Sequence, residues 1–76
     1  MNIFYNDNTL YINMDDIADS KDILKLKRRV FKILDDYSID NIVLNIVTDN
    51  HDSKELLNSF IDEYQRVYHG KIIMKK

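Results

Sequence analysis

The sequence predicts an α/β fold of two layers, with two helices packed on a mixed four-stranded sheet. Two observations carry this prediction. Short β-prone runs and longer stretches with helical periodicity follow one another in the order ββαβαβ. The later part of the chain then contains two strand–helix–strand units, which normally form right-handed crossovers between parallel strands.

The composition fits a single domain over residues 1–76. A chain of 76 residues is near the lower limit at which one hydrophobic core stabilises a fold without disulfides or bound metals. A hydrophobic fraction of 45% with 11% aromatics is ordinary for a globular chain. The sequence has no cysteine, which excludes disulfides and thiolate metal sites, and it has no repeat or Gly- or Pro-rich linker.

Charge and hydropathy argue against several partners. The net charge is −2, from 11 basic and 13 acidic residues, whereas a general nucleic-acid binder gains its affinity by neutralising phosphates. The N-terminus shows no signal-peptide pattern, and no apolar run approaches the roughly 20 residues that span a bilayer. We therefore expect a cytoplasmic protein that binds neither nucleic acid nor membrane.

The chain begins with a predicted β-hairpin. Ile3–Tyr5 and Leu10–Met14 are β-prone and are separated by the polar segment Asn6–Thr9. Asn and Asp tolerate the positive φ that tight hairpin turns require.

A helical period predicts an amphipathic helix over Ser20–Tyr37. Its apolar residues recur at three- and four-residue steps: Ile23, Leu26, Val30, Ile33, Leu34 and Tyr37. Its basic residues fall largely elsewhere: Lys25, Lys27, Arg28, Arg29 and Lys32. These form either a solvated helix face, which the flanking aspartates favour, or a surface for nucleic acid or an acidic partner.

A strand, a loop, a second helix and a last strand complete the predicted order. Asn41–Val47 is a compact, mostly β-branched apolar run, and residues 48–53 are polar and predict a loop. The second helix is predicted over 54–68, with these apolar residues: Leu56, Leu57, Phe60, Ile61, Tyr64, Val67 and Tyr68. Gly70 is expected to form a left-handed helix cap, and Lys71–Met74 the last strand.

One face of the predicted sheet lacks a cover. If the strands lie side by side in sequence order, both crossover helices cover the same face. The opposite face then carries Val43, Asn45 and Val47, while Ile42, Leu44 and Ile46 face the helices. We expect this partly apolar surface to bind a partner.

The polar loop contains residue types that often act in catalysis or metal binding. Asp49, His51 and Asp52 could ligate a metal, but three or four converging groups are needed and one short loop rarely supplies them. Ser53 and His51 are two positions apart, which disfavours the geometry of a catalytic triad. Gly70 is the only glycine, which excludes a phosphate-binding glycine loop. We expect no enzymatic activity, no cofactor and no metal. Most of the five tyrosines are expected in the core or at its edge, and the alternative is that they stack on a ligand: Tyr5, Tyr11, Tyr37, Tyr64 and Tyr68.

Three segments form a pattern when they are taken together: Leu10–Met14, the helix reaching Val30 and Leu34, and Ile39–Ile46. In order and spacing they resemble the STAS domains of bacterial anti-sigma-factor antagonists of the sporulation type. In that family an Ile-Val-Leu-Asn strand precedes a loop that ends in Asp-Ser, and a helix follows. Here Asp52-Ser53 ends the loop, and the resemblance covers about residues 9 to 75.

The resemblance implies a regulatory protein-interaction module that binds an anti-sigma kinase. Ser53 would be the phospho-acceptor, and the partner-binding surface would comprise Asn50, His51, Asp52, Ser53, Lys54 and Glu55. A phosphate adds about −1.5 to −2 charge and changes a binding surface without refolding it. This sequence departs from the family at Lys54 and Glu55, where a small residue and glycine are usual.

The residues around Ser53 also support a structural interpretation. Asp52 followed three positions later by Glu55 predicts a capping box, with Ser53 exposed in the first helical turn. In that case the chain is an assembly module, which forms a homodimer through the uncovered sheet face without phosphorylation.

Overall fold

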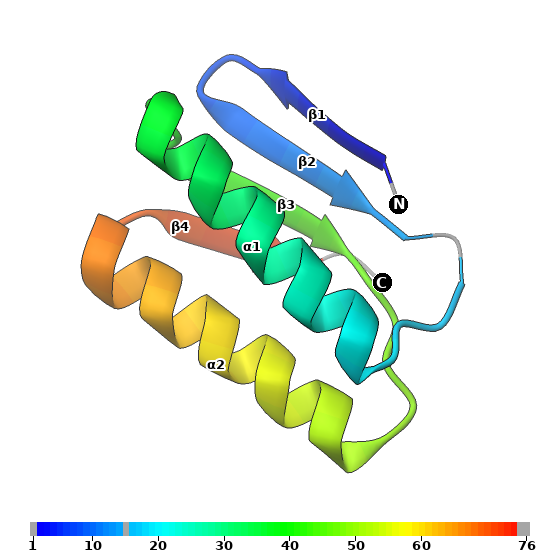
Figure 1. Ribbon diagram of the computed structural model, residues 1–76. Helices are drawn as coiled ribbons and strands as arrows, with labels where there is room; N and C mark the ends of the chain where they lie inside the picture. Colours follow the sequence, from blue (N-terminus) through cyan, green and yellow to red (C-terminus); the bar gives the residue numbers. More distant parts are fainter. Residues whose placement is uncertain (1, 15, 75–76) are drawn as a thin grey trace.

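Six elements follow one another in the predicted order within residues 2–14 and 16–74, which the computed structural model describes. The strands and helices are β1 (Asn2–Asn6), β2 (Thr9–Asn13), α1 (Ser20–Asp36), β3 (Asn41–Asn45), α2 (His51–Tyr68) and β4 (Lys71–Met74). The sheet order is β1-β2-β3-β4, with β1 antiparallel to β2 and the other pairs parallel. Both helices cover the same face of the sheet (Figure 1). The predicted fold class is confirmed.

A two-residue turn joins β1 to β2. Asp7 and Asn8 have φ values of 53° and 57°, as a type I′ turn requires at both central positions. The Asn8 carbonyl also accepts the backbone N–H groups of Asp40 (2.8 Å) and Asn41 (3.3 Å). The tip of the hairpin is therefore tied to the beginning of β3.

Helix α1 begins with a capping box that the sequence analysis missed. The Asp19 carboxylate accepts the backbone N–H of Asp22 at 2.9 Å, and the Asp22 carboxylate accepts that of Asp19 at 3.0 Å. The bond from the Asp22 N–H holds the pKa of Asp19 below its usual value. At the other end, Tyr37 is the C-cap and is 61% exposed, so it lies outside the predicted apolar stripe.

The boundaries of β3 and α2 differ from those predicted. β3 ends at Asn45, and Val47 lies beyond it in the loop, where its carbonyl accepts the N–H of Ala18 at 2.8 Å. Helix α2 begins at His51, three residues earlier than predicted, because Asn50 is its N-cap.

The end of α2 corrects the role predicted for Gly70. His69 adopts the left-handed conformation with φ 59°, and Gly70 has no positive φ. Gly70 is required for a different reason: a Cβ on it would lie 1.9 Å from the hydroxyl oxygen of Tyr64. The glycine leaves room for a buried aromatic ring.

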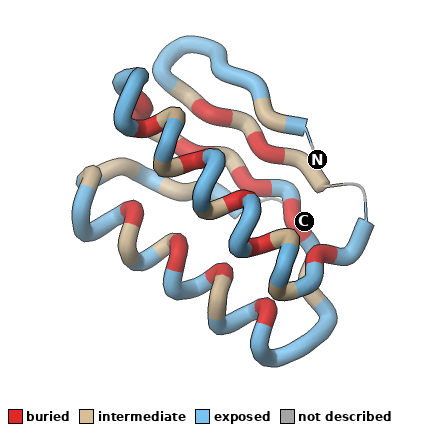
Figure 2. Tube along the Cα trace, in the orientation of Figure 1, coloured by how far each residue is buried: buried red, intermediate tan, exposed pale blue. Residues whose placement is uncertain are grey.

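The core lies between the sheet and the two helices (Figure 2). Its buried hydrophobic residues are Leu10, Ile12, Ala18, Ile23, Leu26, Val30, Leu34, Ile39, Ile42, Leu44, Ile46, Leu57, Phe60 and Tyr64. The hydroxyl of Tyr64 donates to the carbonyl of Ile39 at 3.3 Å. Burial raises the pKa of Tyr64, and the charge of Asp40 adds to the effect. The neutral phenol is therefore the form that this core accommodates.

Candidate functional site

The segment predicted to bind a partner forms the N-terminal cap and first turn of α2. The Asn50 side chain accepts the backbone N–H of Ser53 at 2.8 Å. The capping box predicted from Asp52 and Glu55 is therefore wrong, because Asp52 already lies inside the helix. Around the buried Ser53, the other five residues of the predicted surface are exposed: Asn50, His51, Asp52, Lys54 and Glu55.

Ser53 itself is fully buried, which contradicts its predicted exposure in the first turn. Its hydroxyl oxygen lies 3.4 Å from that of Ser20, with which it shares a hydrogen bond. Ser20 is the first residue of α1, so the two serines join the beginnings of the two helices. A kinase reaches the Ser53 hydroxyl only if this contact between the helices opens.

The ionisable groups of the loop do not converge on Ser53. His51 Nε2 lies 3.0 Å from Glu55 Oε1, one turn further along the same exposed helix face. The Ser53 hydroxyl pairs with Ser20 and not with an imidazole. Within residues 2–14 and 16–74, no three His, Cys, Asp or Glu side chains form a group that could hold a metal ion.

The basic run of α1 lies mostly in solvent. Lys25, Arg28 and Lys32 are exposed, while Lys27 is half-buried and pairs with Glu63 of α2 at 3.2 Å. The Lys27 ammonium also lies 5.8 Å from the centre of the Phe31 ring. One member of the run thus bridges the two helices, and the others form a solvated face.

The tyrosines divide between the core and the surface. Tyr64 and Tyr68 stack 5.9 Å apart on α2, as expected for core and core-edge residues. Tyr5 and Tyr37 are exposed, and their ring centres lie 6.0 Å apart. This second pair is therefore not part of the core in which most of the tyrosines were expected.

A row of apolar side chains crosses the sheet face opposite α1 and α2, which we call the open face. The strand register places Phe4 opposite Tyr11, Tyr11 opposite Val43, and Val43 opposite Ile73. Their neighbours along β2 and β3 are buried on the helix side, so the alternation of a strand directs this row outward. The Phe4 and Tyr11 rings stack with centres 5.1 Å apart.

Polar residues, all but one of them uncharged, border the apolar row on both sides. By the same alternation, one border consists of Asn2, Asn13 and Asn45, and the other of Asn6, Thr9, Asn41 and Lys71. Among the residues that the structure describes on this face, Lys71 alone carries a charge. The open face is therefore an apolar centre with a rim of amides and a hydroxyl.

Only part of this surface was predicted from the sequence. Val43 and Asn45 lie on it as predicted, whereas β3 ends before Val47. Phe4, Tyr11 and Ile73 lie on it and were not predicted there. The alternation of Tyr11 with two buried residues in β2 was a signal that could have revealed one of them.

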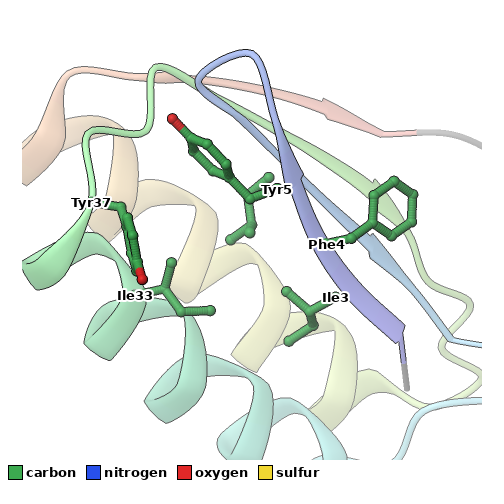
Figure 3. A pocket seen from close by; sticks show the side chains of 6 residues that line it. Ile3, Phe4, Tyr5, Ile33 and Tyr37 are labelled. Carbon is green, nitrogen blue, oxygen red and sulfur yellow. The ribbon is translucent and has the colours of Figure 1, made fainter.

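An apolar groove of about 280 Å³ lies on the helix side of the sheet beside β1. Ile3 and Ile33 point toward one another across it, and Phe4 points away from it, to the opposite face of the sheet (Figure 3). Its full lining is Ile3, Phe4, Tyr5, Leu10, Ile33 and Tyr37. The groove exists because β1 is the edge strand and is less covered by α1 than β2 is.

No protein-family model, curated protein or solved structure matches this chain. The resemblance to anti-sigma-factor antagonists therefore stays a prediction. In the part of the chain that the structure describes, neither helix is long and apolar enough to cross a membrane.

Proposed function

We propose that this chain is a cytoplasmic, non-catalytic assembly module that associates with a second copy of itself through the open face. The observation that carries this proposal is the row formed by Phe4, Tyr11, Val43 and Ile73. An apolar centre surrounded by a polar rim is the usual anatomy of a protein–protein interface.

The chemistry of the rim favours a second copy as the partner. An Asn side chain carries both donors and an acceptor, so amides from two identical faces can pair with one another. A face bearing several like charges would repel its own copy, whereas this one carries Lys71 alone among its described residues. The open face is thus complementary to itself in charge and in hydrogen bonding.

A glutamate at the centre of the open face tests the proposal. Val43→Glu places a carboxylate in the apolar row of both copies, and we expect it to weaken association at least about tenfold. Light scattering over a range of protein concentrations measures the effect. The matched control is Val67→Glu, at a position 57% exposed on α2 in the other layer, which should associate as the wild type does.

Two outcomes would contradict self-association through this face. One is a wild-type chain that remains a monomer at every concentration tested. The other is a Val43→Glu variant that associates as strongly as the wild type.

The anti-sigma-factor antagonist hypothesis is a second proposal for the same chain. The strand β3, a loop and the helix α2 that contains Ser53 follow one another, as the family's pattern has them, which supports it. The burial of Ser53 weighs against the proposed switch, since phosphorylation must first open the contact with Ser20. Mass spectrometry of the chain purified from its source cells tests it directly. Phosphate on Ser53, and an anti-sigma kinase recovered with the unmodified chain, are the expected results; absence of both would end it.

A further inference from the structure

The outer edge of β1 is free of charge. β1 consists of Asn2, Ile3, Phe4, Tyr5 and Asn6, and in the part of the chain that the structure describes no other strand borders its outer side. Proteins commonly protect an edge strand with lysine, which discourages pairing with another chain. The opposite edge strand, β4, begins at Lys71. Among the described residues of the two edge strands, only β4 contains a lysine.

The hairpin geometry identifies which backbone groups of β1 face outward. In a hairpin with a two-residue turn, the residues flanking the turn form a hydrogen-bonded pair, here Asn6 and Thr9. Alternation along the ladder then pairs Phe4 with Tyr11 in the same way. The N–H and C=O groups of Ile3 and Tyr5 therefore point away from β2.

We propose that two copies pair along β1 in antiparallel orientation, with a two-fold axis at Phe4. Ile3 of each copy then lies opposite Tyr5 of the other, and each such pair exchanges both of its N–H···O bonds. The result is a continuous sheet of eight strands. This inference rests on the proposed function, because it describes how the open face is enlarged.

The side chains of this register are compatible on both faces of the joined sheet. On the open face, Phe4 meets Phe4 of the second copy, so the two apolar rows become one. At the ends of the pairing, Asn2 lies opposite Asn6 of the second copy, amide against amide. On the helix side, Ile3 of the second copy lies beside Tyr5, at the mouth of the groove seen in Figure 3. No charged side chain of β1 opposes another.

The open face of a single copy is smaller than a stable protein–protein interface, and pairing along β1 enlarges it. Three strands of five residues and one of four, about 4.8 Å apart with about 3.3 Å per residue, cover a flat area on the order of 300 Å². A stable interface buries roughly 800 Å² of accessible surface on each partner. Pairing along β1 doubles the flat area of the open face to on the order of 600 Å², which is closer to that size. Two joined sheets can then stack face to face as a closed tetramer with two-fold axes.

A single introduced cysteine tests the register, because the natural chain has none. Residues opposite one another in a non-hydrogen-bonded antiparallel pair have Cα atoms about 4.5 Å apart, within the range of a disulfide. We expect Phe4→Cys to form a disulfide-linked dimer under mild oxidation at least about tenfold faster than Val67→Cys. Adding Val43→Glu to both variants removes association through the open face and leaves the β1 edge intact.

A proline at position 5 should prevent two copies of β1 from pairing, and an alanine at the same position is its control. Tyr5→Pro removes an outward N–H that the β1–β2 ladder does not use, which an edge strand tolerates. Tyr5→Ala loses the same ring but keeps the N–H group. In the Phe4→Cys, Val43→Glu background, we expect Tyr5→Pro to abolish the rapid cross-linking and Tyr5→Ala to retain it.

The outcomes of these experiments distinguish pairing along β1 from association through the open face. Fast cross-linking in the Val43→Glu background, blocked by Tyr5→Pro, supports edge pairing whether or not the open face associates. Cross-linking of Phe4→Cys no faster than that of Val67→Cys in that background overturns edge pairing. If the wild type nevertheless associates in a Val43-dependent manner, the proposed function survives without it.

Discussion

Ser53 occupies a site that fits a small hydroxyl but not a charge. We expect Ser53→Asp to lower the free energy of unfolding by roughly 3 kcal/mol, because a carboxylate would be buried against the first turn of α1. Ser53→Ala, which loses only the long contact with Ser20, should cost about 1 kcal/mol or less. Urea unfolding followed by circular dichroism measures both. Equal stability of the two variants would mean that this position is open to solvent.

Gly70 has a steric role that a substitution can isolate. We expect Gly70→Ala to lower the free energy of unfolding by about 1 to 3 kcal/mol, since its Cβ would overlap the Tyr64 ring. His69→Gly is the contrasting change, because glycine adopts the left-handed conformation of this position without strain. It should leave the free energy of unfolding equal or raise it by up to about 1 kcal/mol. The reverse ranking in thermal unfolding would restore Gly70 as the cap.

These two residues show where local sequence rules fail. A glycine just after a helix is usually its left-handed cap, and the sequence contains no sign that His69 takes that conformation instead. The need for Gly70 comes from Tyr64, a residue of the preceding helix whose ring packs under the glycine. Likewise, the burial of Ser53 depends on Ser20, which is distant in sequence. Contacts of this kind become visible only when the elements are assembled.

At the scale of elements, the N-cap of α2 distinguishes the observed boundary from the predicted one. We expect Asn50→Ala to lower the free energy of unfolding by about 1 kcal/mol, because it removes the acceptor for the Ser53 N–H. Asp52→Ala should cost less, since that carboxylate only interacts with the positive end of the helix. Chemical unfolding of the two variants gives the ranking, and a larger loss for Asp52→Ala would favour the predicted capping box.

The helices and strands were predictable because their apolar residues recur at the spacing of a helix or a strand with few exceptions. Four apolar residues at helical spacing in α1 are buried, among them Leu26 and Val30. The alternation in β3 also predicted its helix-facing side correctly. The predicted start of α2 was three residues too late, because the preceding segment contains several good capping residues. The apolar row of the open face needed the strand register, which aligns residues from four separate segments. Periodicity within one segment does not supply that alignment.

At the scale of the whole molecule, stability should fall from the centre of the sheet toward β1. β3 lies between two strands and has Ile42 and Leu44 fully buried, whereas β1 contains no buried residue. We expect the hydrogen-bonded amides of Phe4 and Asn6 to exchange at least about tenfold faster than those of β3. Hydrogen exchange followed by NMR, at a concentration where light scattering gives a monomer, measures this. Equal protection of the two strands would mean that the sheet opens as one unit.

The fold as a whole followed from the order of the elements and the handedness of crossovers. Two strand–helix–strand units in sequence order require both helices on one face, and the structure has them there. The uncovered face and its partial apolar character were therefore predictable before any side chain was placed. Which residues fill that face, and which edge of the sheet lacks charge, depended on the pairing of β1 with β2.

The turn at Asp7 and Asn8 has a consequence for engineering the chain. As an exposed two-residue loop between strands, it resembles the places where tags, new domains or new chain termini are usually tolerated. Here the Asn8 carbonyl also receives the N–H groups of Asp40 and Asn41. An insertion or a circular permutation at this turn would displace the entry of the chain into the central strand. This exposed turn therefore also helps to fix the position of β3 in the sheet.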